Sequence, residues 1–573
     1  MHSKRPPTVG TCQWAWIVAV LAWPVCALAA APADGKVTLL DPVFVEAAPV
    51  ATGAAGIPWQ YFAVPVFEVI SRCPNAFNEA YARALEKATA ARLAFLPAEF
   101  WGELPTPIKV VIYNRPPDPR EGYVQLSPID LTWSSEDSAI LGSDSVRLSH
   151  PLTLGDGDTF INCGNYWDVQ PGLADFSVDV DSAILLETRA PRFPAWFIAG
   201  VEGPRGLYSH RALRSSLQGD RLVLPNAVWT TTPETMAIQD EAKRRRKDGG
   251  PPRVRTLLPL GDLFGADVGP DQRDLWGAEA SLFVRWGLFR SGNRQGFLDF
   301  VRRTAKEPVT EALFRECLGR GYPEVQRQLS DYLPEAASDA LTVPVEVPAA
   351  DPLYIRDATS TEVARIVGDW GRLEGKAAGS LQFEYQRECL DQADRLFERI
   401  VARKEKDPLF LAAFGLYALQ VADNARAREA LEAAAAAGVV RPLAYVELAR
   451  LRLQNALPAF PAGFGDLREP EFTELVGLLT TARMQMPSLL SSYMVLARVL
   501  EHAPSVPTLE QLLPLGEGAR LFPQETALAC RAAALYRKSG FERQAASIVD
   551  RARGFARSER DRVQLAAVSA GNP

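Results

Sequence analysis

The sequence predicts an α+β region followed by an all-α region built from helical repeats. In the first 350 residues proline and glycine are frequent, and short apolar runs such as PIKVVIY (107–113) indicate buried strands. Beyond residue 353 both residues become scarce and apolar residues recur with helical spacing. The segment between these regions, 336–352, is small, β-branched and proline-spaced, which is typical of an extended linker. At 573 residues the chain exceeds what one core serves, so we expect domains at 31–335 and 353–573.

Within the first domain, local patterns predict an alternating order of strands and helices. Alanine-rich amphipathic sequence indicates a helix at 78–96, and apolar runs indicate strands at 107–113 and 158–163. Residues 177–190 fit a strand at their start and a helix at their end, so both remain open. Later apolar periodicity predicts helices at 278–289, 296–305, 309–317 and 323–333.

The second domain repeats itself with a period of 34 residues. Adding 34 to Pro408 gives Pro442, and adding 34 to Phe414 gives Leu448. Small residues recur where paired helices would cross, including Gly415. This pattern resembles tetratricopeptide repeats over 383–455 and 488–555, interrupted by the proline-rich segment 458–470. The resemblance implies a solenoid whose concave face binds a protein or peptide partner.

The N-terminus has the pattern of an export signal. Lys4 and Arg5 precede an apolar run from 14 to 31, which ends in Ala27-Leu28-Ala29. We expect a signal peptide at 1–30 with cleavage near Ala29, and therefore a periplasmic or secreted bacterial-type protein. An uncleaved anchor is the alternative, because the run is just long enough to span a bilayer.

Charge and cysteine content narrow the function further. A net charge of -7 and a pI of about 5.5 argue against a general nucleic-acid binder, and no later stretch is apolar enough to span a membrane. Export would place the chain in an oxidising compartment, where Cys73 and Cys163 of one predicted domain could form a disulfide.

Three segments of the first domain carry a resemblance to a known family: LPTPIKVVIYNRP (104–116), FPAWFIAGVEG (193–203) and LLPLGDLFG (257–265). From about 59 to 333 the domain resembles a peptidase-MA-like, gluzincin-type metallopeptidase domain. Such enzymes bind zinc with two histidines four residues apart and a glutamate from the next helix. The resemblance therefore implies an α+β metallopeptidase-like fold in front of the repeats.

The residues that such chemistry needs are missing from this sequence. After signal cleavage only His150, His210 and His502 remain, and no two of them are four residues apart. If the usual spacing holds, Val178, Asp179 and Ser182 occupy the His, Glu and His positions, and Ala199 occupies that of the third ligand. We therefore expect no bound metal, no cofactor and no zinc-dependent catalysis.

Two further interpretations stay open in this region. Acidic residues could form a carboxylate site for a hard cation, although such acids usually face solvent; they are Asp175, Asp179, Asp181, Glu187 and Glu202. Trp196 and Glu202 could line a surviving cleft that binds a peptide. A large aromatic residue more often anchors a core, so we favour that role for Trp196.

Together these patterns predict an exported, non-catalytic pseudopeptidase that acts as a protein-binding or scaffolding module through its repeats. The alternative is a hydrolase with a non-standard, carboxylate-based site. A third possibility is structural: the first domain caps the open end of the solenoid.

Overall fold

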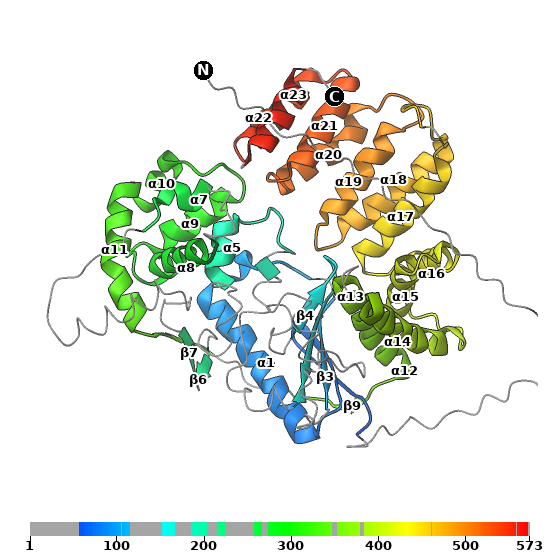
Figure 1. The fold of residues 1–573 in the computed structure, drawn as a ribbon, viewed down its shortest axis with the longest axis horizontal. Helices are drawn as coiled ribbons and strands as arrows, with labels where there is room; N and C mark the ends of the chain where they lie inside the picture. The colour runs from blue at the N-terminus through cyan, green and yellow to red at the C-terminus, as the bar shows by residue number, and fades with distance from the viewer. Residues whose placement is uncertain are drawn as a thin grey trace, which may run out of the picture. The chain divides into compact units, whose positions relative to one another are not determined.

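In the computed structural model the fold is described for 57–104, 106–114, 152–166, 185–202 without 187, 216–224 without 219, 257–265, 273–346, 352–378, 383–459, 461–556 and 558–570. All of these residues belong to one compact unit, Gly53–Pro573. An N-terminal α/β region with a mixed sheet is followed by a C-terminal region of many helices, as the sequence predicts (Figure 1).

The main sheet has six strands in the order β4-β5-β3-β2-β1-β9. Strands β2, β3 and β5 run parallel, and the remaining neighbours are antiparallel. Every residue of β3 is buried, which explains its unbroken apolar sequence. The strands are β1 (Gln60–Val64), β2 (Phe67–Ser71), β3 (Ile108–Tyr113), β4 (Leu152–Gly155), β5 (Phe160–Asn165) and β9 (Arg356–Asp357).

Helices from both halves of the chain cover the two faces of this sheet. Alternate strand residues such as Val69 and Val110 pack under α1 (Asn75–Phe95). The opposite face, which includes Val111, packs against Trp370 in α13 (Asp369–Ala378). Figure 1 shows α1 and α13 on opposite sides of the sheet. The packing therefore continues across the boundary predicted at 353, because β9 pairs with β1 of the main sheet and α13 covers one face of that sheet.

A helical lobe with an aromatic core is formed largely by helices that lie between β5 and β9 in the sequence. The predicted helices between 278 and 333 are all present, with ends shifted by a few residues. The core of the lobe contains Trp196, Phe283 and Phe300. Its helices are η1 (Ala98–Phe100), α5 (Ala195–Glu202), α7 (Leu260–Gly265), α8 (Arg273–Phe289), α9 (Arg294–Thr304), α10 (Glu311–Leu318) and α11 (Tyr322–Ser338).

The predicted linker contains regular structure. Helix α11 runs to Ser338, and β8 (Leu341–Pro344) joins a three-stranded antiparallel sheet with β6 (Ser216–Gln218) and β7 (Arg221–Leu224). Val343 of this strand is buried and lies opposite Leu222 of β7. Of the predicted extended segment 336–352, residues 336–338 are helical, 341–344 are extended because they form a paired strand, and 347–351 lie outside the described residues.

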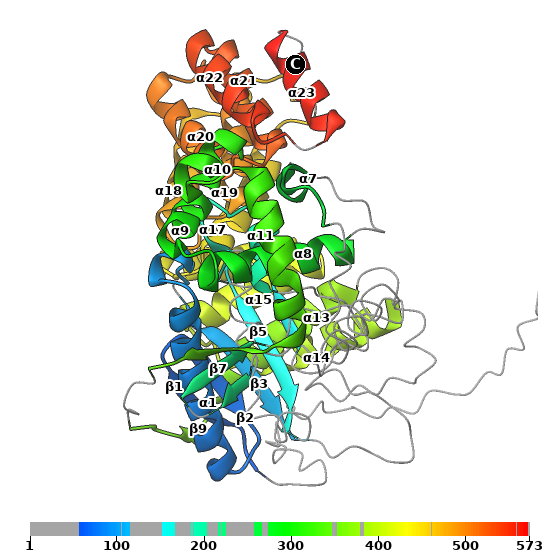
Figure 2. The same ribbon diagram turned by 90° about the vertical axis from the view of Figure 1, so that its left-hand side faces the viewer.

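The C-terminal region consists largely of successive helix pairs. The first helix of each pair contacts the first helix of the next (Figures 1 and 2). It begins with α12 (Ser360–Val363), a π-helical turn η4 (Ala364–Gly368), α13 and α14 (Phe383–Val401). The pairs that follow are α15/α16 (Pro408–Gln420, Asn424–Ala436), α17/α18 (Pro442–Ala456, Glu469–Met484), α19/α20 (Leu490–Glu501, Leu509–Leu521) and α21/α22 (Thr526–Lys538, Glu542–Arg553), before α23 (Glu559–Ser569).

Within this series α13, α15, α17, α19, α21 and α23 contact one another in succession, and we call them the first helices. Gly415 lies at a crossing of α15 and α16, where an added Cβ would come within 2.7 Å of Leu431 Cγ. Side chains cap several helices; Asp407, for example, accepts a hydrogen bond from the Phe410 N–H at 2.7 Å. Over the part of the chain that the structure describes, no helix combines the length and apolarity needed to cross a bilayer.

Candidate functional site

Most of the predicted peptidase positions lie outside the described residues. This holds for Val178, Asp179 and Ser182, and for the other acidic residues at 175, 181 and 187. Ala199 lies within α5, and Glu202 is the last residue of that helix. The carboxylate-based site therefore remains a prediction.

Packing within the lobe accounts for the Pro-x-Trp-x-x-x-Gly segment. The side chain of Trp196 is 1% exposed, and its ring centroid lies 5.1 Å from that of Phe264 and 5.4 Å from that of Phe283. Gly200 faces α8 so closely that an added Cβ would approach the Ala280 carbonyl oxygen to 2.7 Å. Trp196 thus lies in the aromatic core and not on the wall of a cleft, while Gly200 permits close contact between two helices.

The two cysteines that could pair do not form a disulfide. Both Cys73 and Cys163 are buried free thiols. Cys73 belongs to the apolar cluster under α1, whereas Cys163 of β5 belongs to the cluster under α13. They therefore lie on opposite faces of the sheet. Burial raises the pKa of the Cys73 thiol to about 12, so this thiol is unreactive at neutral pH.

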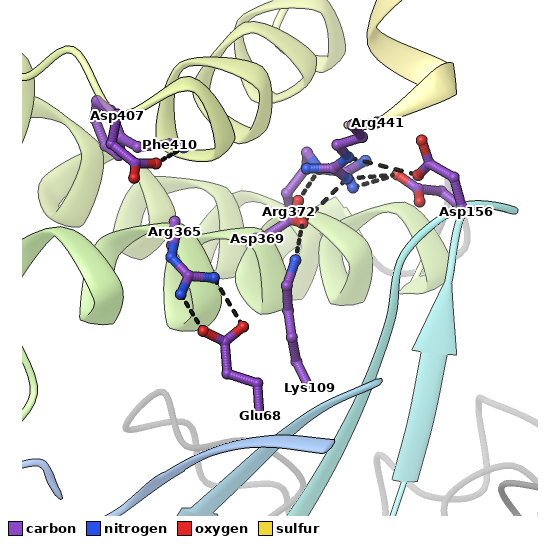
Figure 3. Close-up of polar contacts among 10 residues, drawn as sticks. Glu68, Lys109, Asp156, Arg365, Asp369, Arg372, Asp407, Phe410 and Arg441 are labelled. Carbon is purple, nitrogen blue, oxygen red and sulfur yellow. Dashed lines mark hydrogen bonds and ion pairs between the residues drawn. The ribbon is translucent and has the colours of Figure 1, made fainter. Parts of the chain in front are cut away.

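The most unusual feature is a buried group of six charged residues where the sheet meets the first helices (Figure 3). We call it the junction cluster; it consists of Lys109, Asp156, Asp158, Asp369, Arg372 and Arg441. Their side chains are at most 5% exposed. They come from β3, from the turn between β4 and β5, from α13 and from the residue that precedes α17. Three cations thus face three carboxylates away from water.

Asp369 is the centre of this network. Its Oδ1 accepts a hydrogen bond from Arg372 Nε at 2.7 Å, and its Oδ2 lies 3.1 Å from Arg441 Nη2. Lys109 Nζ lies 3.9 Å from the same Oδ2 atom. Asp156 Oδ2 accepts from Arg372 and lies 3.3 Å from Arg441 Nη2. Each arginine therefore bridges a carboxylate in the turn between β4 and β5 and the carboxylate of Asp369 in α13.

Asp158 has a second role, because it caps a helix from a distant part of the chain. Its Oδ2 accepts a hydrogen bond from the Leu443 N–H in the first turn of α17 at 2.7 Å. Arg441 occupies the N-cap position and makes no side-chain cap, and Pro442 has no N–H to donate. The turn that presents Asp158 depends on Gly157, whose φ of +104° is unfavourable for other residues. The turn between β4 and β5 thus supplies the side-chain cap at the start of α17.

The surroundings shift the pKa values of Asp369 and Asp158 in opposite directions. Burial alone would raise the pKa of Asp369, but the charges of Arg372 and Arg441 outweigh it and hold the pKa well below its usual range. For Asp158, burial dominates over Arg441 and raises the pKa to about 7. Burial also lowers the pKa of Lys109 to about 8. Asp158 and Lys109 are thus the members of the cluster that titrate nearest to neutral pH.

A second buried ion pair crosses the same junction. Arg365 of η4 holds Glu68 of β2 through two hydrogen bonds, one of them 2.9 Å long (Figure 3). Burial and Glu68 raise the pKa of the neighbouring Tyr61 to about 12. Next to these polar groups lies an apolar cluster that includes Ile70, Val111 and Trp370. Sheet and helices therefore share one continuous core.

The junction cluster can fix geometry, but it is closed to a substrate. Its atoms contact one another, and in the described part of the chain their side chains are almost completely buried. Sequence reasoning overlooked the buried charges of this junction, although a signal existed: Lys109 and Glu68 are the only charged residues of two short strands that are mostly apolar. A charge buried in such a strand requires a partner.

No family model matches this chain, and a comparison with curated proteins finds no match either.

Proposed function

We propose that this chain is an exported, non-catalytic binding protein in which a degenerate peptidase-like region anchors a tetratricopeptide-like solenoid. The succession of first helices is the observation that carries the proposal. Helices α17, α19 and α21 each contact the next, so their exposed residues contribute to one surface. Such a surface suits an extended peptide or a helix of a partner protein.

The shared core at the junction supports a scaffolding role. Both the apolar cluster and the six buried charges join the sheet to α13 and to the start of α17. A solenoid that ended at α13 would leave apolar residues such as Trp370 and Leu373 uncovered. The sheet of the N-terminal region thus covers the open end of the first helices. This covering role does not require peptide hydrolysis.

Site-specific crosslinking tests the binding role. The full chain would carry a photoreactive benzoylphenylalanine at Gln454, an exposed position on α17, and would be expressed in its native cells. The matched control places the same group at Glu429, which is exposed on the second helix α16. We expect a discrete crosslinked partner from position 454 only. Equal crosslinking from both positions, or none from either, would contradict the proposal.

Metal analysis tests the non-catalytic part. The mature protein would be purified without chelators and without a histidine tag, then assayed for bound metals and for cleavage of a fluorogenic peptide library. We expect no stoichiometric transition metal and no chelator-sensitive cleavage. Either one would favour the hydrolase alternative and direct attention to Asp179 and Glu202.

A further inference from the structure

The surface of the first helices contains a pocket of about 150 Å³. Three successive first helices line it: α17 and its C-cap contribute Arg450, Leu453, Gln454 and Leu457, α19 contributes Met494, Val495 and Arg498, and α21 contributes Arg531. Leu453 and Val495 are buried, so they form an apolar floor. The three arginines surround this floor with positive charge.

These arginines keep unused hydrogen-bonding capacity. Arg450 pairs with Glu447 at 2.8 Å, and Arg531 Nε lies 3.9 Å from Glu501 Oε1. Both arginines are 44% exposed, so these pairs are weak and leave several guanidinium donors free. For Arg498, which is exposed, the described part of the chain provides no carboxylate within ion-pair distance. An excess of cationic donors thus surrounds an apolar pocket in a protein whose net charge is -7.

The spacing of the helices points to the shape of the ligand. Because α17, α19 and α21 pack in succession, their axes are about 8–10 Å apart. An extended peptide in the polyproline II conformation has three residues per turn and advances about 3.1 Å per residue, so every third side chain lies on the same face about 9 Å further along. Carboxylates at every third position would therefore meet Arg450, Arg498 and Arg531 in turn, and an apolar side chain between them could enter the pocket.

We infer that this pocket binds an extended acidic peptide segment of a partner protein, with carboxylates three residues apart and an apolar side chain between them. The inference rests on the proposed binding function and specifies its ligand. The apolar floor favours a peptide over an inorganic anion, which would gain nothing from Leu453 and Met494. The planar guanidinium groups fit carboxylates through two parallel hydrogen bonds.

Fluorescence anisotropy with the full mature chain tests this inference. The probe is a labelled, amidated nonapeptide with Glu at positions 1, 4 and 7, Leu at position 5 and Ala elsewhere. One control peptide has the same composition with its three Glu residues adjacent, and a second has Gln in place of Glu. We expect the spaced peptide to bind at least about tenfold more tightly than either control, because charged hydrogen bonds form only in register.

Matched variants locate the binding site. Arg498→Glu is expected to weaken binding of the spaced peptide at least about tenfold, and Arg498→Lys less. The control Arg428→Glu changes charge equally at an exposed arginine of α16 and is expected to leave the affinity unchanged. Circular dichroism and urea unfolding would verify that all three variants fold.

Several results would overturn the inference: equal binding of the spaced and clustered peptides, full affinity in Arg498→Glu, or displacement of the peptide by equimolar pyrophosphate. The crosslinking experiment separates this failure from a failure of the proposed function. If the partner still crosslinks at Gln454 in the Arg498→Glu background while no acidic peptide binds, the acidic ligand is refuted and the binding role stands. If crosslinking is also absent from wild type, both are refuted.

Discussion

Replacing Arg441 by Met tests whether the junction cluster holds the sheet and the solenoid together. Arg441 is 2% exposed and lies 3.1–3.5 Å from Asp156, Asp158 and Asp369. Methionine fills a similar volume but leaves three buried carboxylates facing two cations. Loss of one partner from a buried ion network costs about 3–5 kcal/mol in the free energy of unfolding. We expect a loss of this size in urea unfolding at pH 8.

The pH dependence of this loss gives a sharper test. Burial raises the pKa of Asp158 to about 7, so in wild type this group is largely protonated at pH 6 and ionised at pH 8. Without Arg441 its pKa rises further, and the folded variant keeps the proton at pH 8. A difference of one bound proton, maintained over one pH unit, changes the free energy of unfolding by about 1.4 kcal/mol. The cost of Arg441→Met is therefore expected to be larger at pH 8 than at pH 6 by about that amount.

Two controls decide whether this reasoning is correct. Arg562→Met removes an exposed arginine paired with Glu559 at 3.2 Å, and such a pair contributes less than about 1 kcal/mol. In an Asp158→Asn background the difference between pH 6 and pH 8 is expected to shrink to the smaller part that comes from Lys109, whose pKa is about 8. A cost below about 1 kcal/mol for Arg441→Met at pH 8, or a cost independent of pH in the presence of Asp158, would refute the account.

Three further substitutions test neighbouring features by urea unfolding. A raised folded-state pKa means that Asp158 favours folding at low pH, and its contribution to wild-type stability falls as pH rises from about 4 to about 7. Asp158→Asn is expected to remove this contribution from the pH profile and to keep the cap on Leu443. Gly157→Ala is expected to cost about 1–2 kcal/mol because φ is +104°, although an added Cβ has room at 3.4 Å from Leu489. Trp196→Ala is expected to cost about 3–5 kcal/mol, whereas a residue lining a cleft would change stability little.

Local patterns in the sequence were sufficient for elements whose burial is set by their own residues. The continuous apolar run of β3 and the amphipathic sequence of α1 predict both elements without knowledge of their neighbours. The small residue at 415 likewise marks a helix crossing that the structure contains.

Contacts between distant parts of the chain could not be predicted in this way. The hydrogen bond from Leu443 to Asp158 joins residues 285 positions apart, and periodicity carries no information on such pairs. For the same reason the segment around Val343 was interpreted as a linker, because its partner Leu222 lies in a different part of the sequence. Trp370 falls within the predicted second domain, 353–573, since nothing in its own helix shows that a sheet covers it.

The junction cluster lies at the start of α17, and the pocket surrounded by Arg450, Arg498 and Arg531 lies near the end of the same helix. Arg441 lies at the start of α17, whereas Leu453 lies 12 residues further on, about 18 Å away along the helix axis. Burying six charges contributes little net stability, because desolvation offsets their attraction. The apolar cluster around Trp370 supplies the favourable energy of the junction, and the charges specify which turn meets which helix. An anchor of this kind fixes α17 at one end while its other end stays exposed, which is the arrangement that a binding surface on a rigid support requires.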